Sequence, residues 1–373
     1  MNVVCLLPVT GHPRYAKRIS MLKAEGMQVT ALAFERPYHK GRPADCPTEI
    51  IGRIPHGRYL YRLWVYLRAR ALLKRRLRGA DAVYCFGLDT LMLTRLALMG
   101  RSLPCFLEIG DVRDIQTDPR LSGKLFRTLD RWLVRYARGA VFTAPDFYGI
   151  YYRQWLGETF PHHIIENKID FTPESVPAVP LSRDLLRIGY FGLLRCVWSA
   201  RALMAIADGL GERVHIRVAG YSMLPEGVLN ELKARGNIEV EGAYQSPTDL
   251  PRLYGSVDMV WACYAPIQDD DWNLRWARTN RFYEACAFGR PLITRAGSND
   301  GQAVASLRIG LVLDCVEPDQ AVAAIAGLAP EAISQWAANS RALPMSVYAY
   351  TDEQAKLAGD LHAARLPQEP DTP

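Results

Sequence analysis

The 373-residue sequence lacks several features that would place it in a specialised class of protein. None of its eight cysteines forms a Cys-x-x-Cys pair, and Cys/His pairs at ligand spacing are missing. We therefore expect reduced, buried thiols and no zinc site. No apolar run approaches the ~20 residues that span a bilayer, and Pro8 ends the first apolar run too early for a signal peptide. These absences favour a cytoplasmic globular protein.

What the sequence contains is a repeated alternation of apolar runs and segments with helical spacing. In the first half, strands are predicted at 2–9, 28–34, 81–87, 104–110, 139–144 and 162–170, with helices over 14–26 and 88–100. The pattern restarts in the second half, with strands at 185–192, 214–220, 238–244, 258–264 and 309–314. Such alternation predicts parallel sheets with helices on both faces, which is the α/β class.

The proline-rich segment from Pro173 to Pro180 marks a boundary between two domains. We expect a Rossmann-like N-terminal domain over 1–172, a linker over 173–183 and a Rossmann-like C-terminal domain over 184–345. A helix within 346–366 is expected to pack back toward the first domain, and 367–373 to be a disordered tail. Two doubly wound domains form a cleft, and ligands bind beyond the carboxyl ends of their strands.

Polar residues follow the predicted strands of the first half. His12 and Arg14 lie at a turn before the first helix, where they either contact an acceptor or phosphate or decorate a solvated loop. Glu108 and Asp111 follow a later strand, and a carboxylate there could act as general base on an acceptor hydroxyl, with Asp111 ahead of Glu108. The alternative is a surface loop whose charges pair with one another.

Two further residues of the first half stand at strand ends. Arg113 lies in the same loop as Asp111, and Asp89 follows the preceding strand, where it either binds a ligand or caps the next helix. We assign His12 with the two carboxylates to catalysis. We assign Arg14, Asp89 and Arg113 to the acceptor.

Glycines follow the predicted strands of the second half. Gly192 precedes Arg195, and Gly220 precedes Tyr221. Glycine lets a ligand approach the backbone, the helix that follows can direct its N-terminus at an anion, and arginine pairs with phosphate oxygens. Turn glycines are common, so the position at strand ends carries more weight than the spacing.

The stretch "TNRFYEACAFGRPLIT", residues 279–294, predicts a helix that begins at Thr279 or Asn280 and stops at Gly289. Arg281 and Glu284 then share one helix face at spacing i,i+3. One reading is a surface ion pair. The other is a site in which the carboxylate accepts ribose hydroxyls and the arginine holds a diphosphate.

This stretch resembles the E-A-x-x-x-G-x-P-hydrophobic signature of the GT-B glycosyltransferases, group 1 or family 4-like. "RIGYFGLLR" (187–195) is similar to their phosphate loop, and "NIEVEGAYQSPTDLPRLYGSVDMVWACY" (237–264) to their N-V-x-F-x-G-x-V segment. "IIENKID" (164–170) resembles the I-P-N-G-V-D that closes the first domain. The likeness covers nearly the whole chain and is most specific in the second half.

The resemblance implies a GT-B fold, with two Rossmann-like domains facing a central cleft. It implies a nucleotide-sugar donor on the second domain, an acceptor on the first, and no metal, because side chains and helix dipoles neutralise the leaving phosphates. By the same resemblance Glu284 binds the ribose, and Arg195 and Arg281 bind the diphosphate. The full predicted donor set is Glu284, Arg281, Arg195, Asn280, Gly192, Gly220 and Tyr221.

The sequence departs from the family at Trp276, where many members have an acid that touches the donor sugar. The sugar and the stereochemical outcome therefore stay open; an inverting enzyme would use Asp111 as base. The run Asp269–Asp271 resembles a metal-binding D-x-D, but we favour a solvated acidic loop over a contact to the donor.

Basic and aromatic residues interleave over 56–79, a pattern that suits the surface of an anionic membrane. The alternative is a helix with a solvated basic face, and no nucleic-acid module is visible. The predicted membrane residues are Trp64, Arg68, Arg70, Lys74, Arg75, Arg76 and Arg78.

Together these features predict a peripheral enzyme on the inner face of the cytoplasmic membrane. It would move a sugar from a nucleotide diphosphate to a hydroxyl of a lipid-linked glycan in surface polysaccharide biosynthesis. The rivals are a nucleotide-sugar epimerase on the same fold, which would turn over donor without acceptor, and a non-catalytic basic membrane-binding protein.

Overall fold

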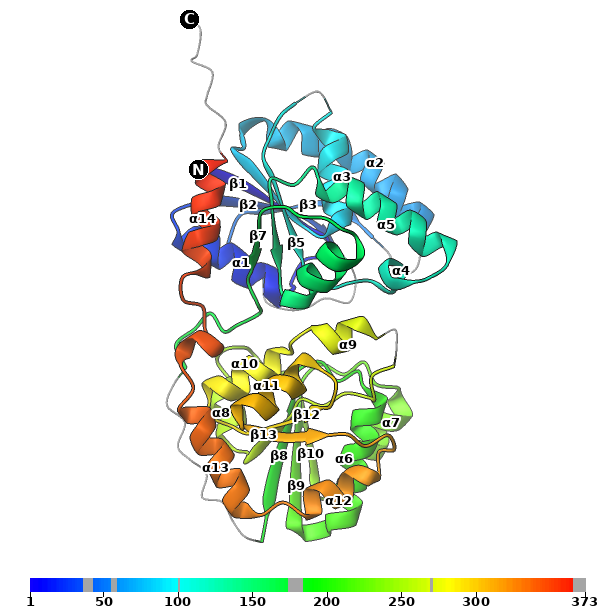
Figure 1. Cartoon of the computed structure of the whole chain (residues 1–373), viewed down its shortest axis with the longest axis vertical. Coiled ribbons are helices and arrows are strands. Elements are labelled where there is room, and N and C mark those ends of the chain that lie inside the picture. The colour runs from blue at the N-terminus through cyan, green and yellow to red at the C-terminus, as the bar shows by residue number, and fades with distance from the viewer. Residues whose placement is uncertain (36–42, 55–58, 100, 174–183, 269–270, 365–373) are drawn as a thin grey trace, which may run out of the picture. The chain divides into compact units, whose positions relative to one another are not determined.

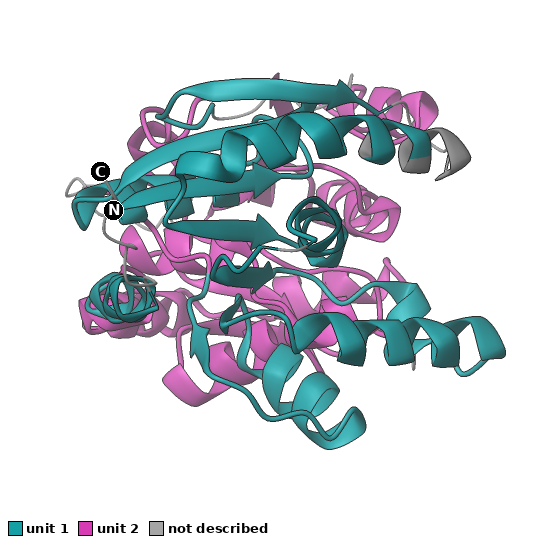
Figure 2. Ribbon diagram, turned by 90° about the horizontal axis from the view of Figure 1, so that it is seen from above, with its two compact units in different colours: residues 1–166, 351–373 teal, residues 167–350 magenta. Residues whose placement is uncertain are grey.

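The computed structural model describes residues 1–35, 43–54, 59–99, 101–173, 184–268 and 271–364 (Figure 1). The chain forms two compact units (Figure 2). Unit 1 comprises Met1–Glu166 and Thr351–Pro373, and unit 2 comprises Asn167–Tyr350. Residues 174–183 of the predicted linker and the predicted tail 367–373 lie outside the described residues.

Unit 1 is built on a seven-stranded parallel sheet in the order β3-β2-β1-β4-β5-β6-β7. The strands β1, β4, β5 and β6 are almost wholly buried, as their continuous apolar sequences predict. The strand bounds are β1 (Asn2–Leu7), β2 (Gln28–Glu35), β3 (Thr48–Arg53), β4 (Ala82–Phe86), β5 (Cys105–Ile109), β6 (Gly139–Phe142) and β7 (His162–Ile164).

Helices cover this sheet. On one side α3 contacts both α2 and α5, and on the other α14 contacts α1 and β7 (Figure 1). The helix bounds are α1 (Pro13–Ala24), α2 (Tyr59–Arg76), α3 (Leu88–Ala97), α4 (Asp114–Thr117), α5 (Leu121–Val134) and α14 (Glu353–Ala363), with a 3-10 turn η1 (Leu77–Gly79) and a π-helix η2 (Phe147–Trp155).

Unit 2 has a six-stranded parallel sheet in the order β10-β9-β8-β11-β12-β13. Its strands are β8 (Leu186–Phe191), β9 (Val214–Ala219), β10 (Ile238–Gly242), β11 (Met259–Trp261), β12 (Leu292–Arg295) and β13 (Gly310–Leu313). The helices are α6 (Val197–Leu210), α7 (Glu226–Lys233), α8 (Leu250–Gly255), α9 (Trp272–Trp276), α10 (Asn280–Ala287), α11 (Asn299–Leu307), α12 (Gln320–Ala326) and α13 (Pro330–Arg341), with 3-10 turns η3 (Gly211–Arg213) and η4 (Met345–Val347).

Side chains alternate across the sheet of unit 2 and build a core on each face. Tyr190 of β8 packs in the core formed with α6, α7 and α12, and its neighbour Phe191 packs in the core formed with α8, α10 and α11. This alternation follows from the period of two residues in a strand. The two parallel α/β domains that the sequence predicts are therefore present.

Two features of the fold were not predicted. The edge strand β3 is largely exposed and contains Gly52, so it has no continuous apolar run to announce it. Ile169 pairs with Ala349, which draws the segment after Glu166 into unit 2, whereas the predicted boundary stands at 172.

Candidate functional site

The helix α10 begins where the sequence predicts. The hydroxyl oxygen of Thr279 accepts a hydrogen bond from the backbone N–H of Phe282 at 3.2 Å, which caps the first turn. The helix ends at Ala287, and Gly289 has a φ of +62°, a left-handed conformation that suits glycine. The position of this cap and of this stop is confirmed.

Arg281 of α10 is buried, with 5% of its surface exposed. Its Nη1 donates to the carbonyl oxygen of Trp261 at 3.1 Å, and its Nη2 donates to the hydroxyl of Tyr264 at 2.6 Å. The guanidinium also lies over the rings of Tyr190 and Tyr264, 4.8 and 5.1 Å from their centroids. Its hydrogen bonds within the described residues all go to uncharged groups, and its charge also lowers the pKa of Asp300.

Glu284 is buried one turn further along α10 and accepts a hydrogen bond from the hydroxyl of Tyr254, on α8, at 2.7 Å. Burial and the nearby Glu284 raise the pKa of Tyr254 well above its ordinary value, so the hydroxyl keeps its proton and donates. Because Arg281 and Glu284 are both buried, the reading of this pair as a surface ion pair is wrong.

Asp300 of α11 holds the start of α10. Its Oδ2 accepts from the backbone N–H of Thr279 at 3.1 Å and from the Thr279 hydroxyl at 2.7 Å. The Thr279 hydroxyl thus donates to Asp300, while its oxygen accepts from the backbone N–H of Phe282. Burial raises the pKa of Asp300 to about 6, against the lowering effect of the bonds from Thr279. Asp300, Tyr254 and Tyr264 were not predicted from the sequence as members of this site.

The loops that follow β8 and β9 are joined to one another. The backbone N–H of Leu194 donates to the carbonyl oxygen of Tyr221 at 2.9 Å, and the backbone N–H of Met223 donates to the carbonyl oxygen of Leu194 at 2.8 Å. A Cβ at Gly220 would lie 1.7 Å from the carbonyl oxygen of Gly192, so only glycine fits at Gly220. The two predicted glycines are therefore brought into contact.

Three other residues of the predicted donor set are exposed. Arg195 lies just before the N-terminus of α6, a position that favours an anion. The side chain of Tyr221 is 56% exposed, and Asn280 is exposed at the first position of α10. Exposed groups at a helix start and a strand end are accessible to a ligand.

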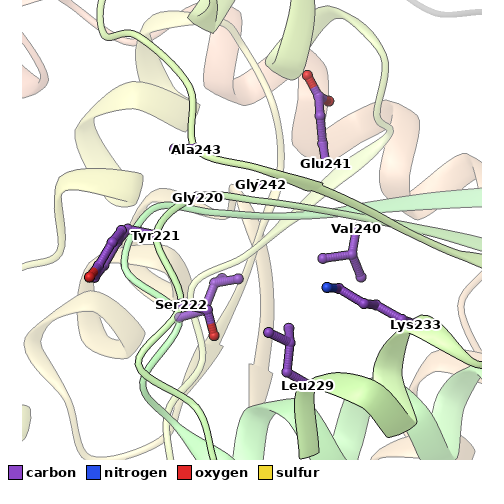
Figure 3. Close-up of a pocket in the computed structure, with 10 residues that line it drawn as sticks. Gly220, Tyr221, Ser222, Leu229, Lys233, Val240, Glu241, Gly242 and Ala243 are labelled. Atoms are coloured by element: carbon purple, nitrogen blue, oxygen red, sulfur yellow. The ribbon is translucent and has the colours of Figure 1, made fainter. Parts of the chain in front are cut away.

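A pocket of about 340 Å³ lies beside these loops (Figure 3). Gly220 and Tyr221 line it from the loop after β9, and Leu229 and Lys233 from α7. Its remaining lining residues are Leu194, Ser222, Val240, Glu241, Gly242 and Ala243.

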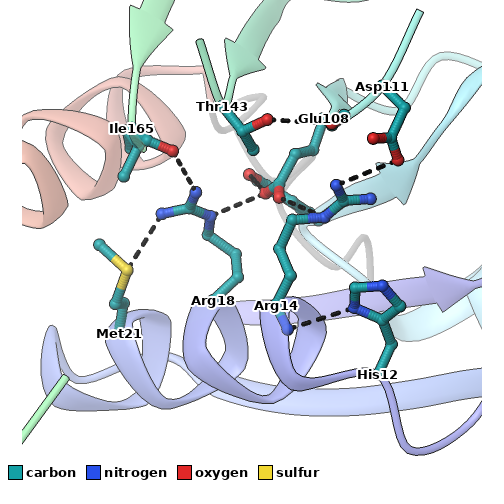
Figure 4. Close-up of polar contacts among 10 residues, drawn as sticks. His12, Arg14, Arg18, Met21, Glu108, Asp111, Thr143 and Ile165 are labelled. Atoms are coloured by element: carbon teal, nitrogen blue, oxygen red, sulfur yellow. Dashed lines mark hydrogen bonds and ion pairs between the residues drawn. The ribbon is translucent and has the colours of Figure 1, made fainter. Parts of the chain in front are cut away.

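In unit 1, Glu108 is the centre of a buried polar cluster (Figure 4). Its carboxylate faces Arg18 Nε at 2.7 Å and Arg14 Nε at 3.5 Å, and accepts from the hydroxyl of Tyr84 at 2.6 Å. Arg18 also donates to the carbonyl oxygen of Ile165 at 3.2 Å, which ties α1 to the end of β7. Arg18 and Tyr84 donate hydrogen bonds to Oε2, and Oε1 forms the ion pair with Arg14, so the geometry gives Glu108 a positioning role for the two arginines.

The accessible carboxylate of this cluster is Asp111, whose side chain is 67% exposed and lies 3.7 Å from Arg14 Nη1. The guanidinium of Arg14 lies against Gly110, where a Cβ would stand 1.4 Å from Nη1. The absence of a side chain at Gly110 therefore makes room for Arg14. His12 caps α1 by accepting from the backbone N–H of Arg14 at 3.3 Å, and its ring stacks on Tyr15. Arg14 therefore contacts each of the three residues that the sequence assigns to catalysis, His12, Glu108 and Asp111.

Arg113 and Asp89 form an ion pair with each other, 2.9 Å between Arg113 Nη1 and Asp89 Oδ1. Asp89 lies in the first turn of α3, and the residue that precedes this helix is Gly87, so the alternative reading of Asp89 as the helix cap is wrong. This pair joins α3 to the loop after β5.

The predicted membrane segment forms α2. Trp64 is 48% exposed, and the guanidinium of Arg68 lies 4.6 Å from its ring centroid. Arg70 bonds the carbonyl oxygen of Leu96, and Arg76 pairs with Glu49 at 2.7 Å, whereas Lys74, Arg75 and Arg78 are exposed. Residues 56–58, and the side chains of 59–63 and 66, lie outside the described residues. Throughout the described part of the chain, every helix is too short or too polar to cross a bilayer.

Trp276, which replaces an acid of the family pattern, is buried and packs 4.9 Å from Trp272. Asp271 precedes α9 and accepts from the backbone N–H of Gln268, while Asp269 and Asp270 lie outside the described residues. Among the residues that are described, no three His, Cys, Asp or Glu side chains gather to hold a metal ion.

Comparison with known proteins identifies the class. The model of the glycosyl transferase 4-like domain matches residues 10–167. Residues 10–167 thus match a glycosyltransferase domain, and the whole chain has the GT-B fold, which confirms the fold and the enzyme class that its motifs predict.

Individual relatives extend this likeness over the whole chain. The succinoglycan biosynthesis protein ExoL of Rhizobium meliloti is 29% identical over 376 residues, covering 95% of this chain and 92% of the relative. Among solved structures, sucrose-phosphate synthase of Thermosynechococcus elongatus has a TM-score of 0.72 at 14% identity, covering 97% of this chain and 98% of its own. HepE of Anabaena, solved with UDP and glucose, has a TM-score of 0.69 at 14% identity, covering 96% and 99%.

Proposed function

We propose that the protein transfers a sugar from a nucleotide-diphosphate sugar to a hydroxyl of a lipid-linked glycan during assembly of a surface polysaccharide. Unit 2 would hold the donor and unit 1 the acceptor. The likeness to a succinoglycan biosynthesis protein supports the polysaccharide context.

The observation that carries the proposal is the buried guanidinium of Arg281, whose bonded partners in the described chain are uncharged. A buried charge is costly unless an opposite charge pairs with it. A diphosphate would supply that charge, and hydrogen bonds from arginine to phosphate are strong. Arg195 and the N-terminus of α6 would add positive potential to the same anion.

Glu284 would then accept hydroxyls of the ribose, because it is held one turn from Arg281 on the same helix. The pocket beside Gly220 and Tyr221 is concave and large enough for part of a nucleotide. Structures of HepE contain UDP and UDP-glucose, which makes UDP the first nucleotide to test here.

For the acceptor we propose Asp111 as the residue that faces the reacting hydroxyl, since it is the exposed carboxylate beside Arg14 and His12. The cations of α2 would bring the enzyme to the inner face of an anionic cytoplasmic membrane, where a lipid-linked glycan is available. Arg281, Arg195 and the start of α6 would offset the charge of the leaving diphosphate without a metal.

A transfer assay tests this function. Purified enzyme is incubated with radiolabelled UDP-, GDP- or dTDP-sugars and a lipid-linked glycan extract, and radioactivity is followed into the lipid fraction. We expect one donor to label the lipid, and Glu284→Ala to abolish labelling while the protein stays folded, at a melting temperature lowered by the loss of the hydrogen bond from Tyr254. Donor turnover without acceptor would instead indicate an epimerase, and full activity of Glu284→Ala would refute the role of this residue.

A further inference from the structure

The helix α5 carries an apolar stripe on its outer face. Its members are Leu121, Leu125, Leu129 and Trp132, with exposed fractions of 72, 65, 39 and 50%. The spacing of four, four and three residues places them on one side of the helix. A surface helix ordinarily turns such a stripe toward the core, so its exposure on α5 needs a cause.

The cause lies on the opposite side of α5, where Asp130 is completely buried. Its carboxylate accepts hydrogen bonds from the hydroxyls of Tyr151 and Tyr152, both at 2.9 Å, and from Nε2 of Gln116 at 2.7 Å. A rotation of α5 that buried the leucines would break all three bonds and expose this network. The helix is therefore fixed with Asp130 inward and the leucines of the stripe outward.

Apolar side chains continue onto the neighbouring helices. Leu96 and the following Met99 are exposed on and just after α3, and Trp64 and Leu67 are exposed on α2. Because α3 contacts both α2 and α5, these side chains and the α5 stripe belong to one layer of helices (Figure 1). Exposed apolar side chains gathered on one helix layer indicate an interaction site.

The charge of this layer is positive. The sequence of α2 contains no acidic residue, and the acid of α5 is the buried Asp130. Lys124, Arg131 and Arg135 are exposed on α5, the last two sharing the carboxylate of Glu158. Leucines and a tryptophan framed by cations suit the interface of an anionic bilayer.

We infer that the α5 stripe inserts its leucines into the surface of an anionic membrane, while the cations of α2 and α5 meet the lipid headgroups. A second copy of the chain is a poorer occupant, because a two-fold contact would bring two basic surfaces together. The inference rests on the proposed membrane location and deepens it by naming the helix that enters the lipid.

Flotation of the full-length protein with vesicles tests the inference. The vesicles contain phosphatidylcholine with or without 30% phosphatidylglycerol, and the variants are Leu121→Ser/Leu125→Ser on α5 and Val316→Ser on unit 2. Val316 is the matched control because it is 63% exposed and lies outside the stripe. We expect the α5 variant to bind anionic vesicles about 100-fold more weakly, roughly tenfold for each leucine removed, and the control to bind as the wild type.

The outcomes separate the claims. If the α5 variant binds vesicles as tightly as the wild type, and only Lys74→Glu/Arg75→Glu releases the protein from them, the membrane location stands and the insertion of α5 is overturned. If the wild type is a dimer and the α5 variant is a monomer, the stripe binds a second copy of the chain, and the inference is also overturned. If the wild type binds no vesicle, both membrane claims fail, while calorimetry with UDP still tests the donor site.

Discussion

Unit 1 and unit 2 each bury a glutamate that accepts a hydrogen bond from a tyrosine hydroxyl, and the two clusters differ in how their charge is balanced. Glu108 accepts from Tyr84 at 2.6 Å and is met by Arg18 and Arg14. Glu284 accepts from Tyr254 at 2.7 Å, and the buried cation on its helix, Arg281, bonds only uncharged groups among the described residues.

The difference separates a cluster that stabilises the fold from a cluster that awaits a ligand. Glu108 faces both arginines inside unit 1, and Asp111 gives Arg14 a second carboxylate, so removing Glu108 leaves Arg18 with unmatched buried charge. Arg281 forms its hydrogen bonds with uncharged groups among the described residues, so its removal should cost less stability than the removal of Glu108 and should cost much affinity for an anion.

Glu108→Gln should lower the free energy of unfolding by about 3–5 kcal/mol, because it leaves Arg18 buried without its carboxylate. Urea denaturation followed by circular dichroism measures this change. The matched control is Asp111→Asn, which removes the exposed partner of Arg14 and should change stability by less than about 1 kcal/mol. Equal losses in the two variants would contradict the distinction between a buried and an exposed partner.

The stability of both units should depend on pH through one buried aspartate each. Burial raises the pKa of Asp130 in unit 1 and of Asp300 in unit 2 to about 6. A raised pKa means that the folded state binds the proton more tightly, so the stabilisation is complete below about pH 4 and is lost as the pH rises through about 6. The loss should reach up to about 3 kcal/mol per group.

Melting temperatures of the wild type, Asp130→Asn and Asp300→Asn between pH 4 and pH 7 check this prediction. Between pH 4 and pH 7 the melting temperature of each asparagine variant should fall less than that of the wild type, since an amide does not titrate in this range. Parallel curves for all three proteins would show that neither aspartate titrates there.

Asp300→Ala should weaken donor binding by about fivefold, because Thr279 loses the acceptor that orients its capping hydroxyl and a helix cap is worth about 1 kcal/mol. Asp300→Asn keeps an acceptor oxygen and should bind nearly as the wild type. Calorimetry with UDP compares the two variants. Equal weakening in both would indicate that the charge of Asp300, rather than its hydrogen bond, matters for the donor.

Removal of divalent metals should have the smallest effect. Because the charge of the diphosphate would be met by Arg281, Arg195 and the start of α6, transfer measured in EDTA should match transfer measured in Mg²⁺. A loss of activity in EDTA that Mg²⁺ restores would mean that the arginines alone do not neutralise the leaving group.

Much of the fold could be predicted because buried parallel strands have continuous apolar sequences. The strands β1, β4 and β8 have such sequences, and the helix α10 begins with a clear cap. The strand β3 was missed because it is exposed at the sheet edge. The outward stripe of α5 was missed because its apolar spacing is the same as that of a helix packed by its leucines.

The site was predicted in part for a related physical reason. Arg281 and Glu284 stand in a local motif, so their spacing identifies them. Their partners Tyr264 and Tyr254 lie 17 and 30 residues away in the sequence, and hydrogen bonds over such distances depend on the folded sheet. The burial of Arg281, which distinguishes a site from a surface ion pair, likewise appears only in the structure.

The most direct test of the central claim is calorimetric titration of the wild type and Arg281→Met with UDP, GDP and dTDP, together with their melting temperatures. All three nucleotides share the diphosphate that Arg281 would bind. We expect the nucleotide that binds the wild type to bind Arg281→Met at least ~30-fold more weakly, a loss of about 2 kcal/mol or more, with the melting temperature unchanged or raised. Unchanged affinity, or affinity lost only together with the folded state, would contradict it.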